Sequence, residues 1–303
     1  MNDYWKYHGL GNDYLVLEPG RFTTPPSAEA VKLICDRHLG IGADGILWGP
    51  LTQPPWASGD DGSASATHSD GEMALVIYNS DGSEGEKSGN GLRIFARHVW
   101  ERKLHQNPEF VLLTRGGPAR AEILTEDGGR VAMEMGQVRF DSASIPVAGE
   151  PREVLRETLE VAGREVVING ATVGNPHCVV LVGMPTPELA RELGPILETH
   201  HLFPNRTNVQ FMRPLDDHAI QIEIWERGSG YTLASGTSSC AAAAVAVKLG
   251  LCQSPVTVNT QGGPLLVTLD SQFNARLEGD VASVGGGDFS PEFLSRLGLH
   301  RTS

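Results

Sequence analysis

The segment that most constrains the fold is residues 240–247, CAAAAVAV, which would be apolar on every side of a helix. Lys248 and Gly250 follow it, as is typical of the end of a helix. A helix without a polar face has to be surrounded by protein. Because short β-rich segments dominate the rest of the sequence, we expect the strands of a curved sheet to surround this helix.

A second helix is predicted directly after residues 88–91, SGNG. Apolar side chains follow at helical spacing and share one face, at Leu92, Phe95, Ala96 and Val99. The β-rich segments around both helices include MALVIYNS, HCVVLVG and AIQIEIWE, and most are closed by Gly, Asp, Asn or Pro. We therefore predict an α+β fold in which curved or closed β-sheets wrap round central helices.

The order of the motifs indicates an internal duplication. GNDY, from Gly11, precedes the helix that starts at Ser88, and GNPH, from Gly174, precedes the helix that starts at Ser235. In both halves the order is Gly-Asn, strands, an acidic residue, Ser-Gly and a buried helix. We infer two similar domains that face one another across a cleft.

Composition restricts the partners of the chain. Acidic side chains number 37 and basic ones 24, and the net charge of −13 argues against nucleic acid as a partner. No segment approaches the roughly 20 apolar residues of a membrane span and no secretory signal is visible, so we expect no membrane association and a cytoplasmic location. Four cysteines without CxxC spacing indicate buried, reduced thiols rather than a metal site or disulfides. A homodimer is the default assembly.

Residues 50–72 are rich in Pro, Gly, Ser and Asp and show no periodicity. We predict a surface loop or hairpin excursion there. Trp56 and His68 within it are interpreted as loop side chains rather than ligands.

The two helix N-termini are candidate anion sites. Backbone N–H groups at a helix start have no partner within the helix, and the aligned peptide dipoles add a partial positive charge. Gly89 and Asn90 open the first helix, Gly236 and Thr237 the second, so a carboxylate could approach either backbone closely. Ser, Asn and Gly are also favoured at ordinary helix starts, but the repetition favours the functional interpretation.

Further polar residues lie beside predicted strand ends, where side chains can reach into a cleft. They are Asn12, Asn79, Asn175 and Asn208, and each could equally serve a turn. The neighbours Glu226 and Arg227 could bind the ammonium and carboxylate groups of an amino acid, or could form a solvated pair. His177 could be a functional or a structural histidine.

Six segments in order resemble the signature segments of the diaminopimelate epimerase family, over nearly the whole chain: KYHGLGNDYLVLE, CDRHLGIGADGIL, NSDGSEGEKSGNGLRIFARHV, GNPHCVV, FPNRTNVQF and ERGSGYTLASGTSSCAAAA. The resemblance implies two pseudo-symmetric domains, residues 1–132 with 281–303 and residues 133–280, with a site between them that uses no cofactor and no metal. It also implies an isomerase of lysine and peptidoglycan biosynthesis that converts LL- to meso-diaminopimelate by two-base proton transfer. The positions that match substrate-binding residues are Asn12, Asn79, Gly89, Asn90, Asn175, Asn208, Glu226, Arg227, Gly236 and Thr237, while His177 and Glu226 match residues that flank the catalytic pair.

The sequence departs from the family pattern at the catalytic pair. The family uses two cysteines, and here Ser88 and Ser235 occupy those positions. A thiol has a reference pKa of about 8.5, so thiolate exists near neutral pH, whereas a serine hydroxyl needs an adjacent base. Tyr231 is a second departure, because the family commonly has Glu there.

Three functions remain open from the sequence. The first is an amino-acid epimerase whose activity is reduced or changed by the two serines. The second is a related racemase, isomerase or dehydratase that acts on a more acidic amino or hydroxy acid, with His177 or Glu226 as the base. The third is an amino-acid-binding homologue that moves no proton.

Overall fold

The computed structural model describes residues 2–52, 55–57, 71–86 and 88–302, and their contacts divide into two units, residues 1–133 with 280–303 and residues 134–279. The chain leaves the first unit within strand β8 (Arg130–Gln137) and returns within strand β17 (Asn274–Asp280). His68 and most of the predicted loop lie outside the described residues. Trp56 is described, and its partly buried side chain packs against a hydrophobic cluster of the first unit.

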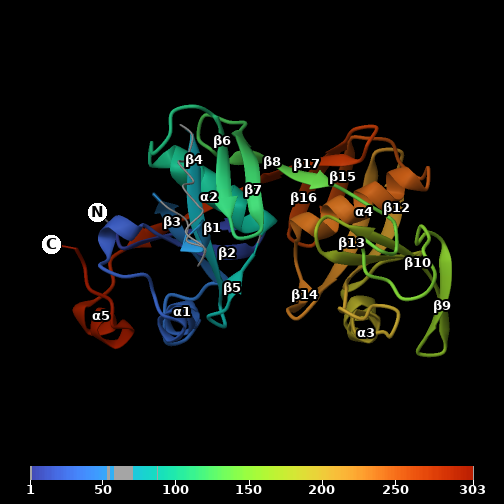
Figure 1. Ribbon diagram of the computed structural model, residues 1–303, viewed down its shortest axis with the longest axis horizontal. Helices are drawn as coiled ribbons and strands as arrows, with labels where there is room; N and C mark the ends of the chain where they lie inside the picture. The colour runs from blue at the N-terminus through green and yellow to red at the C-terminus, as the bar shows by residue number, and fades with distance from the viewer. Residues whose placement is uncertain (1, 53–54, 58–70, 87, 303) are drawn as a thin grey trace. The chain divides into compact units, whose positions relative to one another are not determined.

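Helices and strands alternate in the same order in both units (Figure 1). The first unit contains β1 (Tyr4–Gly9), β2 (Asn12–Leu17), η1 (Pro19–Arg21), α1 (Ala28–Cys35), β3 (Gly45–Leu51), η2 (Pro55–Ala57), β4 (Glu72–Asn79), β5 (Glu84–Gly85), α2 (Gly89–Glu101), β6 (Glu109–Thr114), β7 (Gly117–Ile123), the start of β8, β18 (Ala282–Gly287) and α5 (Pro291–Leu297). The second unit contains β9 (Glu157–Val161), β10 (Arg164–Thr172), β11 (Pro176–Leu181), α3 (Pro187–Glu198), β12 (Asn208–Asp216), β13 (Ala219–Glu226), β14 (Gly230–Thr232), α4 (Gly236–Lys248), β15 (Val256–Thr260), β16 (Gly263–Leu269) and most of β17.

Strand pairing shows that the two units share one topology. In the first unit the order is β18, β1, β2, β3, β4, β6 and β7, with parallel pairing only of β2 with β3 and β4 with β6 among the described strands. In the second the order is β9, β10, β11, β12, β13, β15 and β16, and the parallel pairs β11–β12 and β13–β15 stand at the same places. The predicted duplication is therefore visible in the topology, and the α+β fold class is confirmed.

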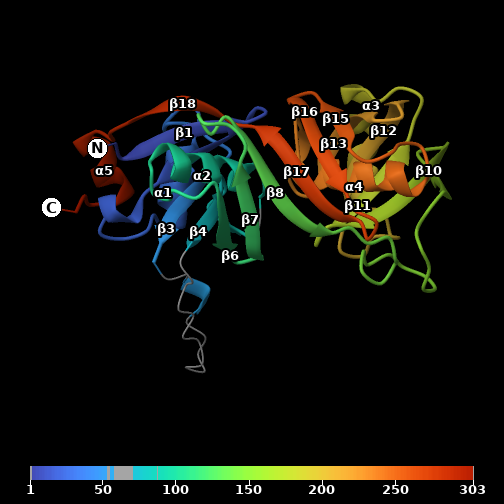
Figure 2. The ribbon, with the colours of Figure 1, turned by 90° about the horizontal axis from the view of Figure 1, so that it is seen from above.

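Each unit encloses one central helix. α4 contacts strands β10, β11, β12, β13, β15 and β16, and α2 contacts β1, β2 and β7 (Figures 1 and 2). Residues 240–246 of α4 are fully buried, as the all-round apolar segment predicts, and the predicted face of α2 (Leu92, Phe95, Ala96, Val99) is fully buried too. Every β-rich segment quoted above lies on a strand, whereas helices α1, α3 and α5 were not predicted. All four cysteines are buried.

The outer helix α3 lies against strand β13 at a point where only glycine fits. A Cβ atom at Gly194 would lie 2.5 Å from the Cγ atom of Trp225, and the indole N–H of Trp225 donates to the Glu198 carboxylate at 2.7 Å. The backbone of α3 at Gly194 thus packs directly against the Trp225 ring on β13. Such a contact leaves no room for an added methyl group.

We expect Gly194→Ala to destabilise the chain by about 1–3 kcal/mol, because the cost of overpacking exceeds the gain in helix propensity of alanine over glycine. Urea unfolding of the variant measures this. Gly183→Ala is the matched control in the same unit, since nothing lies within 4 Å of a Cβ atom at Gly183. Equal stability of the two variants would contradict the close helix–strand contact.

Candidate functional site

Helix α2 begins with a capped N-terminus. Ser88 is the N-cap residue, and its Oγ atom accepts the backbone N–H of Gly91 at 3.0 Å. The hydroxyl of Tyr14, on β2, donates to the same oxygen at 3.3 Å. Gly89 and Asn90 in the first turn are buried. The N-terminus of α2 therefore presents Ser88, held from two sides, at the place where sequence reasoning expected a functional residue.

Tyr14 fits beside Ser88 because its neighbour on β3 has no side chain. Tyr14 pairs in register with Gly45, where a Cβ atom would lie 2.6 Å from the Cε1 atom of the Tyr14 ring. Sequence reasoning missed Tyr14. The signal was present in the two repeated motifs, GNDY and GNPH, which align Tyr14 with His177.

Amide side chains connect the α2 N-terminus to an acidic cluster. The Nδ2 atom of Asn90 donates to Asn12 Oδ1 at 3.2 Å, and Asn12 Nδ2 donates to Asp44 Oδ2 at 2.7 Å. The buried guanidinium of Arg93 donates to Asn90 Oδ1 at 2.8 Å. The two predicted ligands Asn12 and Asn90 are thus brought together by the structure and held in fixed orientations.

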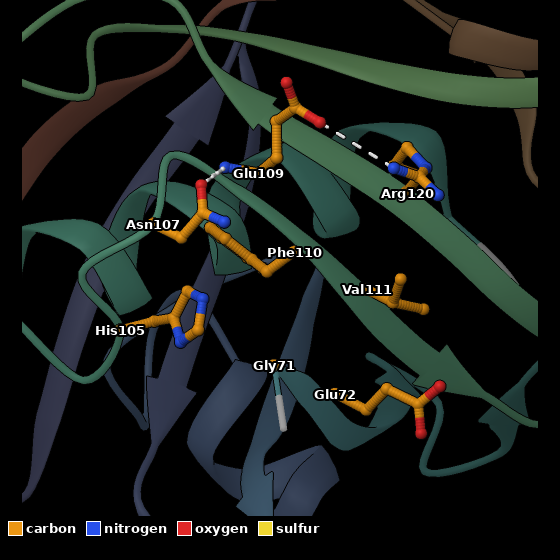
Figure 3. A pocket seen from close by; sticks show the side chains of 8 residues that line it. All are labelled: Gly71, Glu72, His105, Asn107, Glu109, Phe110, Val111 and Arg120. Atoms are coloured by element: carbon orange, nitrogen blue, oxygen red, sulfur yellow. Dashed lines mark hydrogen bonds and ion pairs between the residues drawn. The ribbon is translucent and has the colours of Figure 1, made fainter. Parts of the chain in front are cut away.

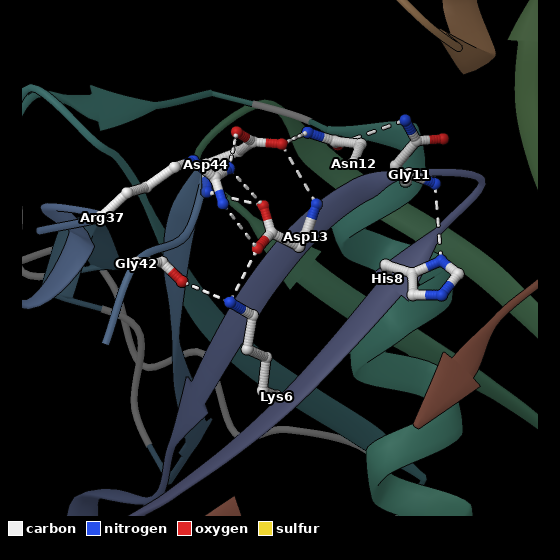
Figure 4. A network of polar contacts seen from close by, with 9 residues as sticks. Lys6, His8, Gly11, Asn12, Asp13, Arg37, Gly42 and Asp44 are labelled. Atoms are coloured by element: carbon white, nitrogen blue, oxygen red, sulfur yellow. Dashed lines mark hydrogen bonds and ion pairs between the residues drawn. The ribbon is translucent and has the colours of Figure 1, made fainter. Parts of the chain in front are cut away.

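The acidic cluster consists of Asp13 and Asp44 with the cations Arg37 and Lys6 (Figure 4). Arg37 bridges the two carboxylates, at 2.7 Å from Asp13 and 2.8 Å from Asp44. Burial by itself raises the pKa of Asp13, but hydrogen bonds from Arg37 and Lys6 outweigh burial and leave that pKa below its usual value. The Asp13 carboxylate is therefore charged at neutral pH, and Arg37 holds Asp44 where its Oδ2 atom accepts from Asn12.

Asn79 lies in an exposed turn at the end of β4. Its Nδ2 atom donates to Ser83 Oγ at 2.9 Å, and its carbonyl accepts the N–H of Gly82 at 2.9 Å. Register places Asn79 opposite Gly45, which in turn stands opposite Tyr14. Asn79 therefore combines a turn role with a register position two strands away from Tyr14.

In the second unit a chain of hydrogen bonds fixes His177. Its Nε2 atom contacts Asn175 Oδ1 at 3.0 Å, and its Nδ1 atom lies 3.1 Å from the amide nitrogen of Gln210. The same amide donates to Ser238 Oγ at 3.0 Å. Because an amide NH₂ is a donor, Nδ1 of His177 accepts and Nε2 carries the proton. Burial lowers the pKa of His177 to about 3, so the imidazole is neutral. These contacts favour an orienting role for His177, toward Asn175, over a role as base.

We expect His177 to stay neutral, with its proton on Nε2, from pH 5 to pH 8, because protonation would have to expel the Gln210 amide and charge a fully buried ring. Nitrogen-15 NMR of histidine-labelled protein measures this, with assignment by His177→Asn. The exposed His218 is the internal reference. A His177 signal that titrates in this range would refute the assigned tautomer.

Asn208 joins two segments through its side chain. Its Oδ1 atom accepts the backbone N–H of Arg227 at 3.0 Å, and its Nδ2 atom donates to the carbonyl of Pro176 at 2.8 Å. Asn208 is buried. It positions the Glu226–Arg227 turn next to the start of β11, which is a scaffolding contact that sequence reasoning did not foresee.

The Glu226–Arg227 turn is stabilised by a buried carboxylate of α3. Glu198 accepts the backbone N–H of Gly228 at 2.9 Å and forms an ion pair with Arg206. Glu226 Oε2 accepts the hydroxyl of Thr232 at 3.2 Å, and the exposed Arg227 donates to a carbonyl oxygen. The turn is thus rigid, while Arg227 retains donors for a ligand.

Ser235 is the N-cap residue of helix α4, and it differs from Ser88 in its capping contact. Within the described part of the chain, the Ser235 side chain accepts no capping hydrogen bond, and the hydroxyl of Ser239 donates to the Ser235 carbonyl at 2.8 Å. Ser235 and Gly236 are buried, and Thr237 is partly exposed. Among the described residues, no helix N–H thus caps the Ser235 Oγ atom, in contrast to Ser88.

Register relates the two sets of residues. The parallel pair β2–β3 sets Tyr14 opposite Gly45, and β11–β12 sets His177 opposite Asn208. Across the next strand, Gly45 pairs with Asn79. Val209 pairs with Trp225, and Asn208 and Glu226 are the next residues outward from that pair. The equivalent positions are Asn12 and Asn175, Tyr14 and His177, Gly45 and Asn208, Asn79 and Glu226, and Ser88 and Ser235. The candidate residues thus form two equivalent sets, one in each unit.

A surface hollow elsewhere in the first unit is lined by none of the candidate residues (Figure 3). Its lining includes His105, Glu109 and Arg120, and the last two form an exposed ion pair at 3.7 Å. No group of three or more His, Cys, Asp or Glu side chains suited to a metal ion occurs within the described ranges. Nor, over those same ranges, is any helix of the length and apolarity that a bilayer crossing requires.

Comparison with known proteins identifies the family. The sequence profile described as diaminopimelate epimerase matches residues 4–140 and 170–284. The chain belongs to the diaminopimelate epimerase family. It is 47% identical over 293 residues to diaminopimelate epimerase 2 of Nostoc sp., covering 96% of this chain and 97% of that protein. It is 35% identical to diaminopimelate epimerase of Pelotomaculum thermopropionicum, covering 94% and 98% of the two chains. Membership of this family makes the chain an isomerase.

Solved structures support the fold. The chain is similar to a probable proline racemase from Agrobacterium radiobacter, with a TM-score of 0.65 and 16% identity, covering 96% of this chain and 93% of that one. It is also similar to a hydroxyproline epimerase from Agrobacterium vitis, with a TM-score of 0.64 and 16% identity, covering 99% and 91%. At 16% identity these two similarities support the fold alone.

Proposed function

We propose that the chain is a cofactor-independent epimerase of a free α-amino acid, with diaminopimelate as the first substrate to test and lysine biosynthesis as its context. The observation that carries this proposal is the equivalence of the two helix N-termini within a chain of this family, since each opens on Ser-Gly above a buried helix. Backbone N–H groups at such ends bind a carboxylate.

The substrate-binding roles follow from the donors that each unit offers. The N–H groups of Gly89, Asn90, Gly236 and Thr237 bind the substrate carboxylate. Asn12, Asn79 and Asn175, with Glu226 and Arg227, hold the ammonium group and the distal end, while Asn208 positions the Glu226–Arg227 turn. Networks such as Asn90–Asn12–Asp44 support the proposal because they fix these amides before a ligand binds.

Ser88 and Ser235 take the two proton-transfer positions, one that removes the α-proton and one that delivers a proton to the opposite face. A hydroxyl is a far weaker acid than a thiol, so we expect slow exchange on an unactivated α-carbon. The low acidity of the serine hydroxyls also favours one second candidate function, epimerisation of a substrate whose α-proton is more acidic than that of diaminopimelate.

Incubation with LL-diaminopimelate in D₂O tests the proposal. We expect deuterium at the α-carbon together with formation of the meso isomer, followed by NMR and chiral chromatography. Ser88→Ala and Ser235→Ala should each abolish exchange, and Ser271→Ala, at an exposed position, is the matched control. Exchange on another amino acid would support the second candidate. Calorimetric binding without exchange on any amino acid would refute the enzymatic proposal.

A further inference from the structure

Tyr14 and Gly91 together fill the acceptor capacity of the Ser88 hydroxyl. A hydroxyl oxygen has two lone pairs and one proton. The Gly91 N–H donates to Ser88 Oγ at 3.0 Å, and the Tyr14 and Ser88 hydroxyls lie 3.3 Å apart, with the more acidic phenol as the donor. The remaining capacity of Ser88 is therefore donation of its own proton. This hydrogen-bond polarity makes Ser88 a proton donor.

The packing of Tyr14 in the sheet fixes its contact with Ser88. Tyr14 is 6% exposed, and its ring occupies the space that a side chain at Gly45 would need. The ring is thereby confined between β3 and the N-terminus of α2. A phenol fixed in this way keeps its hydroxyl on Ser88 without an entropic cost for each turnover.

We propose that Tyr14 acts through Ser88 as the proton reservoir of this position, an inference that rests on the proposed function. The O–H bond of Ser88 breaks as a C–H bond forms at the substrate α-carbon, whose electron pair remains from removal of the opposite proton. The O–H bond of Tyr14 breaks as that of Ser88 re-forms, so the charge rests on the Tyr14 phenolate. After the product leaves, the group at the Ser235 position releases to water the proton that it removed, and water returns a proton to Tyr14 through Ser88, so both positions are restored.

Tyr14 lowers the free-energy cost of proton delivery by Ser88, because the negative charge ends on a phenolate rather than on an alkoxide. A phenol has a reference pKa of about 10, whereas a serine hydroxyl lies beyond the ordinary titrating range. The dipole of α2 favours negative charge at the same place. In the second unit the equivalent residue is His177, whose ring nitrogens contact Asn175 and Gln210. The two units are therefore chemically different at this position, and the phenol that donates to the N-cap serine lies in the first unit.

A thiol placed at position 88 tests Tyr14 without any substrate. In Ser88→Cys, donation from Tyr14 would stabilise the thiolate, so the rate of alkylation by iodoacetamide at pH 7 should fall about tenfold when Tyr14→Phe is added. Ser88→Cys with Tyr78→Phe is the matched control, the same loss of a hydroxyl on β4 of the same unit. The native chain, whose described cysteines are all buried, supplies the background rate.

Equal alkylation rates of Ser88→Cys with and without the added Tyr14→Phe change would overturn the proposal. A merely structural role would lower thermal stability in both backgrounds and leave the pH profile of alkylation in place. In the otherwise native chain, Tyr14→Phe should lower the turnover rate of α-proton exchange at least tenfold with KM unchanged. If the native chain exchanges no amino acid, the proposed function fails, and the thiol titration still decides whether Tyr14 donates to position 88.

Discussion

Replacing both Ser88 and Ser235 by cysteine should raise the rate of α-proton exchange on diaminopimelate by about 10²–10⁴-fold, the usual contribution of an effective general acid–base group. A free thiol with a pKa of about 8.5 already supplies some thiolate at pH 7.5. The N–H of Gly91, which now caps Ser88, would stabilise a thiolate at the same point.

The single variants should gain much less than the double variant. Each keeps one serine, and removal and delivery of the proton are successive parts of one reaction, so the weaker group limits the rate. Deuterium incorporation by NMR measures all three variants. Ser271→Cys adds an exposed thiol outside the proposed site and should leave the rate unchanged. A double variant that folds, binds the substrate and still shows the native rate would remove Ser88 and Ser235 from the proton-transfer positions.

The fold could be predicted because a few segments allow only one outcome. The apolar helix at residues 240–247 has to be enclosed, and the strands of the second unit enclose it. Helices α1 and α3 were missed because they lie on the outside of their sheets and their apolar stripes are short. The duplication was visible in the repeated Gly-Asn and Ser-Gly motifs, and strand register then aligned the two units residue by residue.

The candidate site was less predictable, since side-chain partners depend on register between distant strands. Asn208 was expected to bind a ligand, yet its oxygen and nitrogen both contact backbone groups 19 and 32 residues away. Nothing local to RTNVQF reveals those partners. Tyr14 was missed for a related reason: its role depends on the absence of a side chain at Gly45, on the neighbouring strand.

The most destabilising single change that we expect is at Asp3, which is not among the candidate-site residues. Its carboxylate is fully buried and accepts hydrogen bonds from the Arg301 guanidinium, at 3.0 Å and 2.6 Å, and from the backbone N–H of Phe289 at 2.7 Å. Arg21 forms a further ion pair at 3.4 Å. The Asp3 side chain therefore connects the segment before β1 to the segments on either side of α5.

Asp3→Ala should cost about 3 kcal/mol of unfolding free energy at pH 7, the lower end of the range for a broken buried pair, because Arg301 is partly exposed and can recover water. Asp280→Ala, which breaks the exposed pair with Arg130 in the same unit, should cost at most about 1 kcal/mol. Urea unfolding of both variants beside the native chain measures the difference. Equal losses of unfolding free energy would show that the buried Asp3 contacts stabilise the fold no more than the exposed Asp280–Arg130 pair does.

The Asp3 contribution should also depend on pH in a defined direction. Burial alone raises the pKa of Asp3, but the hydrogen bonds from Arg301 and Phe289 outweigh burial, and the folded-state pKa lies below the unfolded value of about 4. A depressed carboxyl pKa stabilises the fold above the unfolded pKa, and the stabilisation is lost as the pH falls through the folded pKa. The stability difference between the native chain and Asp3→Asn should therefore be constant from pH 5 to pH 7 and shrink below about pH 4. A difference that grows on acidification would mean that Asp3 is protonated in the folded chain.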